Sequence, residues 1–415
     1  MKKIIVTTIF LFSLALSGVS VSGSQSVLIQ NTTIMTVSDS GILENTDLLI
    51  ENGLIAAIGK NLNTNDAKII DASNMIVTPG LIAPHSQLGL VEIELERQTR
   101  DDSTDHYSAG FSISDAFNPS STLIPYNRSG GITSAVVIPS SARSIFSGMA
   151  SVFKLDGELV TDSIAKDIAM AVSFGAGSDS RASQILMLED SFEKVLRFKD
   201  SREQYSLLAD FDYDDYTIRD LEAILRVLNK EIPLIVRSNR AKDLLRMISL
   251  SNKYGIKIIF YGAKEGWRIA DVLAREGIPV ILDPMDNIPD SFDAIAARMD
   301  NAALLNAAGV KILITSQSTH NSYLSRQGAG NAAAYGLPQD EALKALTINV
   351  ADVFGLSKDR GSIEVGKSAD LVIWDGNPLE VSSFATAVMI EGHSISLMSR
   401  SKRLRDKYLI ELGLK

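Results

Sequence analysis

The chain has 415 residues, of which 45% are apolar and 22% charged, and its formal net charge is −10. This composition is typical of a globular protein with enough apolar material for a large domain and a smaller one. The acidic balance argues against a nucleic-acid-binding protein, because such proteins are normally basic. The lack of cysteine excludes disulfides, thiolate zinc sites and lipid attachment through a thiol.

The first residues have the pattern of an export signal. Lys2 and Lys3 precede an apolar run over Ile4–Leu16, and small residues follow over Ser17–Ser24. The apolar run is short for a membrane span. We therefore predict a signal peptide over residues 1–24, a periplasmic or secreted mature protein, and no integral membrane segment after cleavage. An uncleaved anchor is the alternative.

Patterns of short strands occupy both ends of the chain. The predicted strand segments are Val27–Val37, Asp47–Ile58, Lys68–Val77, Gly361–Val365, Asp370–Trp374 and Ala387–Ile390. Asp47–Ile58 is predicted to be a hairpin, because its Asn52-Gly53 pair favours a tight primed turn. We predict that residues 25–79 and 355–415 together form one small β-sandwich domain.

The middle of the chain alternates apolar runs of strand length with stretches of helical period. The predicted strands are Leu81–Leu88, Ile132–Pro139, Ala169–Phe174, Ile232–Val236, Ile256–Phe260, Ile278–Leu282 and Lys311–Thr315. The helical stretches between them include Tyr216–Asn229, Ala241–Lys253, Trp267–Glu276 and Ala294–Ala308. This α/β pattern indicates a parallel sheet buried on both faces, so we predict a TIM-like (β/α)-barrel over residues 80–354. One of its β/α units could be distorted. A doubly wound open sheet is the alternative, although no glycine-rich fingerprint follows the first strand.

One long stretch, Arg97–Ser121, is polar and rich in Asp and Ser. We expect it to be either a mobile loop or a lid over the barrel mouth. His106 lies in it among Asp101, Asp102 and Asp105, and we interpret this cluster as solvated surface.

Two regions resemble the amidohydrolase superfamily. Thr78–Gln87 reads Thr-Pro-Gly-Leu-Ile-Ala-Pro-His-Ser-Gln, which is similar to the family's first barrel strand, PGLID-x-H-x-H. The closing signature resembles that of the imidazolonepropionase-like branch, in the segments Gly336–Pro338, Glu341–Leu343, Ala345–Asn349, Gly361–Lys367, Ala369–Val372 and Asp375–Pro378. The resemblance covers nearly the whole mature chain and implies a metal-dependent hydrolase fold, with a barrel and a β-sandwich.

The resemblance also implies one or two divalent metals that activate water for attack on the C–N bond of an amide or cyclic amide. Imidazoles at the ends of the first, fifth and sixth strands and a carboxylate at the eighth would hold them. His85 stands at the first ligand position, but the others are occupied by Gln87, Arg237, Asn239, Tyr261 and Gln317. An amide is a poor zinc ligand, a guanidinium repels a cation, and Gln317 cannot act as a base near neutral pH. The ligand motifs are therefore degenerate.

The chain contains only four histidines, so few alternative ligands exist. His393 is expected at the surface of a turn, whereas His320 is expected at the barrel mouth, within reach of His85. We predict no cofactor; a single divalent metal such as zinc, held weakly by His85 and His320, is the alternative. Lys154 is interpreted as a lysine at a strand edge rather than as the carboxylated bridging lysine of some family members.

The functional pocket of a barrel lies at the carboxyl ends of its strands. We predict that it is lined by His85, Gln87, Arg237, Asn239, Tyr261, Gln317 and His320, with no catalytic residue assigned. Hydrogen-bonding groups with one or two cations suit a small polar or anionic molecule.

Three functional hypotheses follow. In the first, the protein is an exported amidohydrolase-family member whose ancestral activity is hydrolysis of non-peptide C–N bonds. It would be a catalytically degenerate pseudoenzyme that serves as a ligand-binding or partner subunit, as a homo-oligomer or beside an active homologue. In the second, it is an active, divergent C–N hydrolase with a mononuclear or metal-free site. In the third, it is a purely structural subunit.

Overall fold

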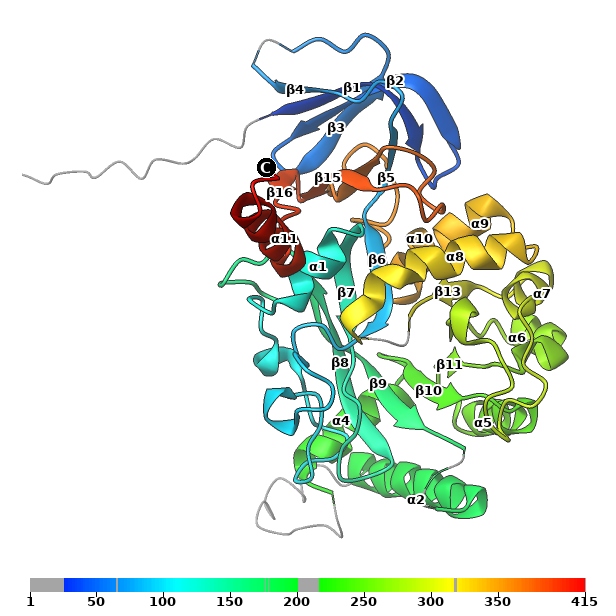
Figure 1. The fold of residues 1–415 in the computed structure, drawn as a ribbon. Helices are drawn as coiled ribbons and strands as arrows, with labels where there is room; N and C mark the ends of the chain where they lie inside the picture. Colours follow the sequence, from blue (N-terminus) through cyan, green and yellow to red (C-terminus); the bar gives the residue numbers. More distant parts are fainter. Residues whose placement is uncertain are drawn as a thin grey trace, which may run out of the picture.

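The structure, a computed structural model, describes residues 26–64, 66–175, 177, 179–200, 216–316 and 319–414 (Figure 1). The predicted export signal over residues 1–24 lies outside them. Two eight-stranded sheets organise the described residues. Figure 1 shows the first sheet above the barrel, built from the blue and red ends of the chain. Among the helices that the structure describes, none is long and apolar enough to cross a membrane.

The first sheet joins the two ends of the chain. Its strands are β1 (Val27–Met35), β2 (Ile42–Glu51), β3 (Leu54–Gly59), β4 (Lys68–Asp71), β5 (Ile76–Pro79), β14 (Leu371–Trp374), β15 (Ala385–Ile390) and β16 (His393–Ile395). β5 pairs with β14 in antiparallel register, with Val77 opposite Ile373. The predicted turn between β2 and β3 has positive φ at both Asn52 (51°) and Gly53 (81°), as a primed hairpin turn requires.

The predicted strand over Gly361–Val365 is wrong. Among these residues Ile363 is buried, and its backbone N–H donates to the Thr36 carbonyl at 2.8 Å, but no strand ladder forms. Gly361 has a φ of +94°, and a Cβ there would lie 2.7 Å from that of Ala351. The close approach of α10 (Ile348–Val353) therefore imposes an irregular backbone on an apolar segment.

The second sheet is the barrel. Its strands are β6 (Leu81–Ser86), β7 (Ile132–Val137), β8 (Phe146–Lys154), β9 (Ala165–Ser173), β10 (Leu234–Ser238), β11 (Ile258–Gly262), β12 (Val280–Leu282) and β13 (Ile312–Ile314). The seven predicted strands all form, and β13 lies beside β6, so the sheet nearly closes. A (β/α)-barrel with a small β-sandwich domain formed by both chain ends is thus the fold class, as predicted.

β8 is the distorted member and was not predicted. It is antiparallel to both β7 and β9. No helix lies between β7 and β8, and the outer face of β8 is covered by the segment 97–121 instead: Phe117 stacks on Phe153 with ring centroids 3.9 Å apart, and Met149 N–H donates to Phe111 O at 2.7 Å. Much of the stretch expected to be a mobile loop or a lid therefore serves as a packed outer layer.

Helices surround the remaining strands (Figure 1). Those with regular α-helical geometry are α1 (Leu123–Arg128), α2 (Arg181–Asp200), α4 (Ile218–Leu228), α5 (Ala241–Tyr254), α6 (Ala270–Arg275), α7 (Asn301–Ala307), α8 (Ser325–Ala334), α9 (Gln339–Lys344), α10 (Ile348–Val353) and α11 (Arg400–Glu411). The helix predicted over Ala294–Ala308 begins only at Asn301. The preceding residues form an irregular segment after β12, in which Glu265 accepts the Ala296 N–H at 3.0 Å.

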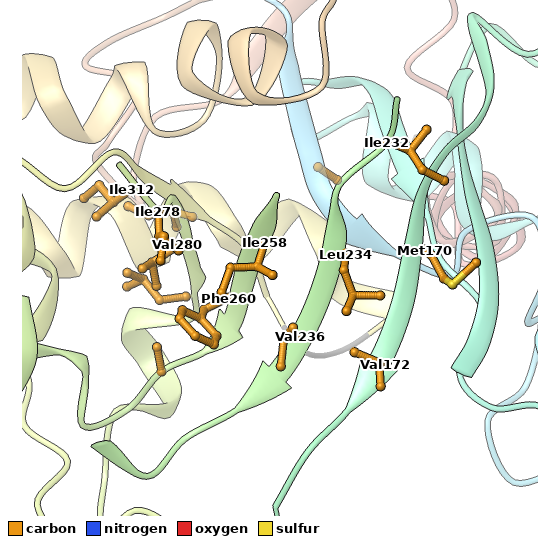
Figure 2. Packing of buried hydrophobic residues seen from close by; sticks show 14 of the residues in the cluster. Met170, Val172, Ile232, Leu234, Val236, Ile258, Phe260, Ile278, Val280 and Ile312 are labelled. Atoms are coloured by element: carbon orange, nitrogen blue, oxygen red, sulfur yellow. The ribbon is translucent and has the colours of Figure 1, made fainter. Parts of the chain in front are cut away.

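Side chains on the barrel strands alternate between two cores. One set, which includes Val236, Phe260 and Val280, packs against the surrounding helices (Figure 2). The other set, which includes Ile235 and Ile259, fills the barrel interior together with side chains of α10. This period of two fixes which residues at the strand ends point toward the barrel axis.

The passage from the small domain into the barrel is made at Gly80, between β5 and β6. Its N–H donates to the Asp370 carbonyl at 2.8 Å. A Cβ at this position would lie 2.2 Å from Oγ1 of Thr133 on β7. Only glycine allows the two strands to approach this closely.

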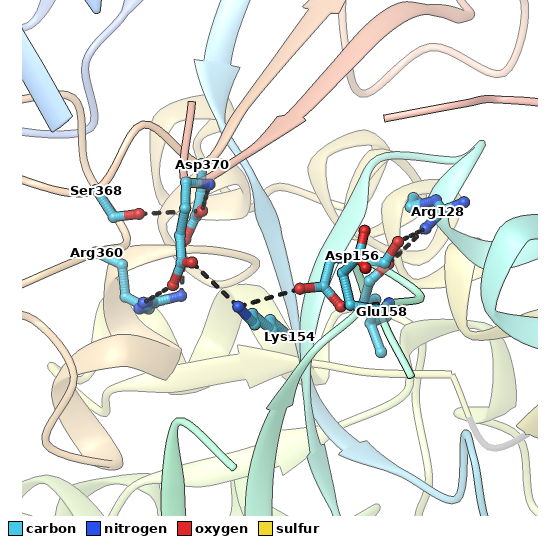
Figure 3. Close-up of polar contacts among 9 residues, drawn as sticks. Arg128, Lys154, Asp156, Glu158, Arg360, Ser368 and Asp370 are labelled. Atoms are coloured by element: carbon cyan, nitrogen blue, oxygen red, sulfur yellow. Dashed lines mark hydrogen bonds and ion pairs between the residues drawn. The ribbon is translucent and has the colours of Figure 1, made fainter. Parts of the chain in front are cut away.

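An ion-pair network also ties the domains together (Figure 3). Arg360 pairs with Asp370 at 2.8 Å, and both side chains are buried. Burial raises the pKa of Asp370, although the charge of Arg360 opposes the rise. Lys154 of β8 pairs with Asp156 at 3.1 Å and with Glu391 at 3.2 Å. Lys154 is thus an interdomain residue at the last position of β8, a strand that pairs on both sides.

We predict that Gly80→Ala lowers the free energy of unfolding by about 1–3 kcal/mol, because the added methyl group overlaps Thr133 in a packed core. Denaturant unfolding measures the change. The matched control is Gly59→Ala, where the new Cβ meets Leu62 Cδ2 at an ordinary 3.5 Å. Equal losses in the two variants would contradict the steric explanation.

Candidate functional site at the barrel mouth

Three side chains meet at the carboxyl ends of β6, β10 and β11. The rings of His85 and Tyr261 stack with centroids 3.9 Å apart and planes inclined by 15°. The guanidinium carbon of Arg237 lies 5.8 Å from the centroid of the Tyr261 ring. Arg237 and Tyr261 follow the inward-facing Ile235 and Ile259 by two residues, so the strand period directs both toward the barrel axis.

This stack has a single charge at neutral pH. Burial, helped by the nearby charge of Arg237, lowers the pKa of His85 to about 3. Burial also raises the pKa of Tyr261 to about 12. The imidazole and the phenol are therefore neutral, and the exposed guanidinium of Arg237 is the charged member.

The backbone of His85 is held by the closing strand of the barrel. The Thr315 hydroxyl, just after β13, donates to the His85 carbonyl oxygen at 3.0 Å. This bond crosses the seam between the last strand and the first. The position of the imidazole therefore depends on barrel closure.

Gln87 is engaged with the segment 97–121. Its Nε2 donates to Oδ2 of Asp102 at 3.0 Å. Asp102 is fully buried and also accepts two bonds from Arg100, at 3.1 and 2.8 Å. Burial of Asp102 opposes its ionisation, but the bonds from Arg100 and Ser140 hold the pKa of its carboxyl below the usual value.

The interpretation of the acidic cluster as solvated surface is therefore wrong for Asp102. It is correct for His106, Asp101 and Asp105, which are exposed. The spacing Arg100-x-Asp102 is the signal in the sequence that could have indicated the ion pair of Asp102.

Asn239 lies against the end of β11. A Cβ on Gly262 would be 2.4 Å from its Oδ1, and Gly262 and Ala263 both have positive φ, 96° and 43°. The Asn239 Oδ1 and the Ser238 hydroxyl are buried without a hydrogen-bond partner among the described residues. Unpaired buried polar atoms are costly and tend to mark sites that bind water or a ligand.

A cavity of ≈ 910 Å³ opens beside this stack. It lies between the β7–β8 loop, the ends of β9 and β10, and residues 291–293. Arg237 and Asn239 line it, whereas His85, Gln87 and Tyr261 do not. The structure thus places only part of the predicted lining in one cavity. A second cavity, of ≈ 700 Å³, lies at the opposite end of the barrel, remote from these side chains.

Gln317 and the side chain of His320 lie outside the described residues, although His320 itself belongs to the 3-10 helix Thr319–Leu324. His393 is exposed on β16, as expected for a surface residue.

The described side chains do not fit a hydrolytic metal centre. Within the part of the chain that the structure describes, no three His, Asp or Glu side chains are grouped so that they could hold a metal ion. One imidazole, His85, faces a protonated phenol and a guanidinium. The Gln87 amide, the other group expected near it, donates to a carboxylate.

We predict that the His85 imidazole stays neutral in the folded protein from about pH 8 to about pH 5, because its folded pKa lies far below the value of about 6.5 in an unfolded chain. Below about pH 6.5 the unfolded state binds more protons than the folded state, so this residue makes stability fall as the pH falls toward 3. Histidine NMR titration, with assignment by His85→Gln, measures the pKa. A midpoint above about pH 6 would refute the prediction.

Comparison with known proteins agrees with the fold and the signature segments. The model of the amidohydrolase family matches residues 241–395. The chain is 27% identical over 388 residues to the amidohydrolase tasK of Hapsidospora irregularis, a match that covers 83% of this chain and 39% of that protein. The chain thus spans well under half the length of that relative.

Two further matches extend over most of both partners. An imidazolonepropionase of Thermoplasma volcanium is 24% identical over 360 residues, covering 81% of this chain and 86% of the relative. A crystal structure of an amidohydrolase from Thermotoga maritima MSB8 superposes with a TM-score of 0.80 at 27% identity, covering 89% of this chain and 99% of that one. With the barrel, the composite β domain and the PGLI and closing segments, these matches show that the chain belongs to the amidohydrolase superfamily.

Proposed function

We propose that this protein has lost the C–N bond hydrolysis of its superfamily and binds a small polar or anionic molecule at the barrel mouth. The observation that supports the proposal is the stack of His85 on Tyr261 beside Arg237. In this arrangement, the positions expected to hold a metal ion are occupied by two neutral aromatic side chains, His85 and Tyr261, and by the cation Arg237.

Charge explains why a divalent metal is disfavoured there. The positive charge of the Arg237 guanidinium repels a metal cation nearby. With its pKa raised to about 12, Tyr261 keeps its proton and cannot supply an anionic oxygen. The same guanidinium can donate paired hydrogen bonds to a carboxylate or phosphate. We therefore propose no metal or other cofactor, and a binding role in place of hydrolysis.

One observation favours a second candidate, an active hydrolase with one zinc at His85 and His320, or with no metal. The depressed pKa of His85 keeps its imidazole neutral, which is the form that ligates a metal. Two imidazoles would leave the metal short of the three protein ligands usual in catalytic zinc sites.

The cellular context is also a proposal. The pattern of residues 1–24 supports export to the periplasm or the exterior. A binding protein of this fold could act as a homo-oligomer or as the partner subunit of an active relative. The support for the partner role is the loss of ligand positions in an otherwise preserved family frame.

We predict that the exported protein, purified without chelators, contains no stoichiometric metal. Added zinc, manganese or nickel should leave its melting temperature unchanged, because a ligand stabilises a folded protein only if it binds it. The triple variant Gln87→His/Arg237→His/Tyr261→His replaces the Arg237 cation by an imidazole. It also introduces two further imidazoles, at positions 87 and 261, near His85. It should gain zinc and a raised melting temperature. Elemental analysis and thermal melts measure both.

Adding His85→Ala to that variant is the control and should abolish the gained zinc. Stoichiometric zinc in the wild-type protein, with hydrolysis of an amide or cyclic amide that is lost in His85→Ala, would overturn the proposed function and support the second candidate.

A further inference from the structure

The cavity beside the stack has a cationic, hydroxyl-rich wall. Arg237 contributes an exposed guanidinium, for which the described residues provide no ion-pair partner. Arg143 and the hydroxyl groups of Ser140, Ser141 and Ser144, from the β7–β8 loop, line the same space. A guanidinium is suited to the two oxygens of a carboxylate, because it can donate two parallel hydrogen bonds to them.

Another part of the cavity lining is apolar. Phe292 lines the cavity with 91% of its surface exposed, and Met187 of α2 lines it with 39% exposed. Ile145 adds a third apolar side chain. Covering an exposed aromatic side chain with an apolar group stabilises a complex, because it removes apolar surface from water.

The position of Phe292 is fixed from both sides. Two residues before it, Asp290 pairs at 2.9 Å with Lys264, whose side chain is only 6% exposed. One residue after it, Asp293 pairs with Arg181. The aromatic ring is therefore presented to the cavity by an anchored segment.

The charges near this apolar wall restrict the charge of the ligand. Arg181 lies between two carboxylates, those of Asp293 and Asp243, so this group of three has a net negative charge. Asp179 lines the rim as well. Of the two arginines that line the cavity, Arg143 already has a partner, so a ligand with one negative charge can pair with Arg237. A second negative charge would be repelled by the carboxylates.

From these walls we propose that the cavity binds a small monocarboxylate that carries an adjacent aryl or branched alkyl group, with the carboxylate on Arg237 and the apolar group on Phe292. The inference rests on the proposed binding function and names its ligand class. The proposed ligand has three features: a single anionic group, an apolar group, and a distance between these two groups that is short enough for both to fit in a cavity of ≈ 910 Å³.

The test uses the full chain and four probes near neutral pH: phenylacetate, its neutral analogue phenylacetamide, acetate, and the dianion phenyl phosphate. Isothermal titration calorimetry should show binding of phenylacetate, with each of the others at least about tenfold weaker. Arg237→Gln should weaken phenylacetate binding at least about tenfold and Phe292→Ser several-fold, because each removes one of the two contacts.

Matched controls are Arg275→Gln and Phe384→Ser, which change exposed residues that do not line the cavity. Both should bind phenylacetate as the wild type does. Equal affinity for phenylacetate and phenylacetamide, unchanged binding in Arg237→Gln, tighter binding of phenyl phosphate, or no binding of any probe would each overturn the proposed ligand class. Metal content and amide hydrolysis measured on the same samples test the proposed function separately, since turnover would refute it and leave the ligand class standing.

Discussion

The strict alternation of side chains along the barrel strands is the constraint on which the site depends. Because Ile235 and Ile259 face the interior, Arg237 and Tyr261 must face the axis at the mouth. A slip of one residue would turn both toward the helices and expose apolar side chains of the core. The bond from Thr315 to His85 then fixes the first strand against the last, so that the imidazole meets the phenol across the barrel.

The residues in the expected ligand positions form a self-consistent arrangement. Stacking of His85 on Tyr261 places a neutral imidazole on a neutral phenol, and the guanidinium of Arg237 approaches the same ring. Gln87 is used elsewhere, since its amide anchors the buried Asp102 and with it the segment 97–121. Gln87, Arg237 and Tyr261 thus each have a physical partner in the fold, which supports a mouth adapted to hydrogen bonding and charge recognition.

The reversed direction of β8 explains where the cavity lies. Because β8 runs antiparallel to β7, the two are joined by a loop at the mouth instead of a crossover helix. That loop brings Ser140, Arg143 and Ser144 to the rim beside Arg237. The outer face of β8, which has no helix of its own, is covered by Phe111 and Phe117. The reversed direction of β8 therefore explains two features: the cavity lies beside the β7–β8 loop, and the polar segment 97–121 is packed on the outer face of β8.

The barrel, the composite β domain, the family and the strand ends at which Arg237 and Tyr261 lie could be predicted from the amino-acid sequence, because they follow from local periodicity and from motifs of contiguous residues. The reversal of β8, the burial of Asp102 and the presence of Phe292 at the cavity could not be predicted in this way, because they depend on long-range contacts. An apolar run does not specify the direction of its strand, and a polar loop does not reveal which of its acids meets a buried amide. Phe292 lies in an irregular segment whose path is set by ion pairs to distant residues, Lys264 and Arg181, and such pairings have no local signal.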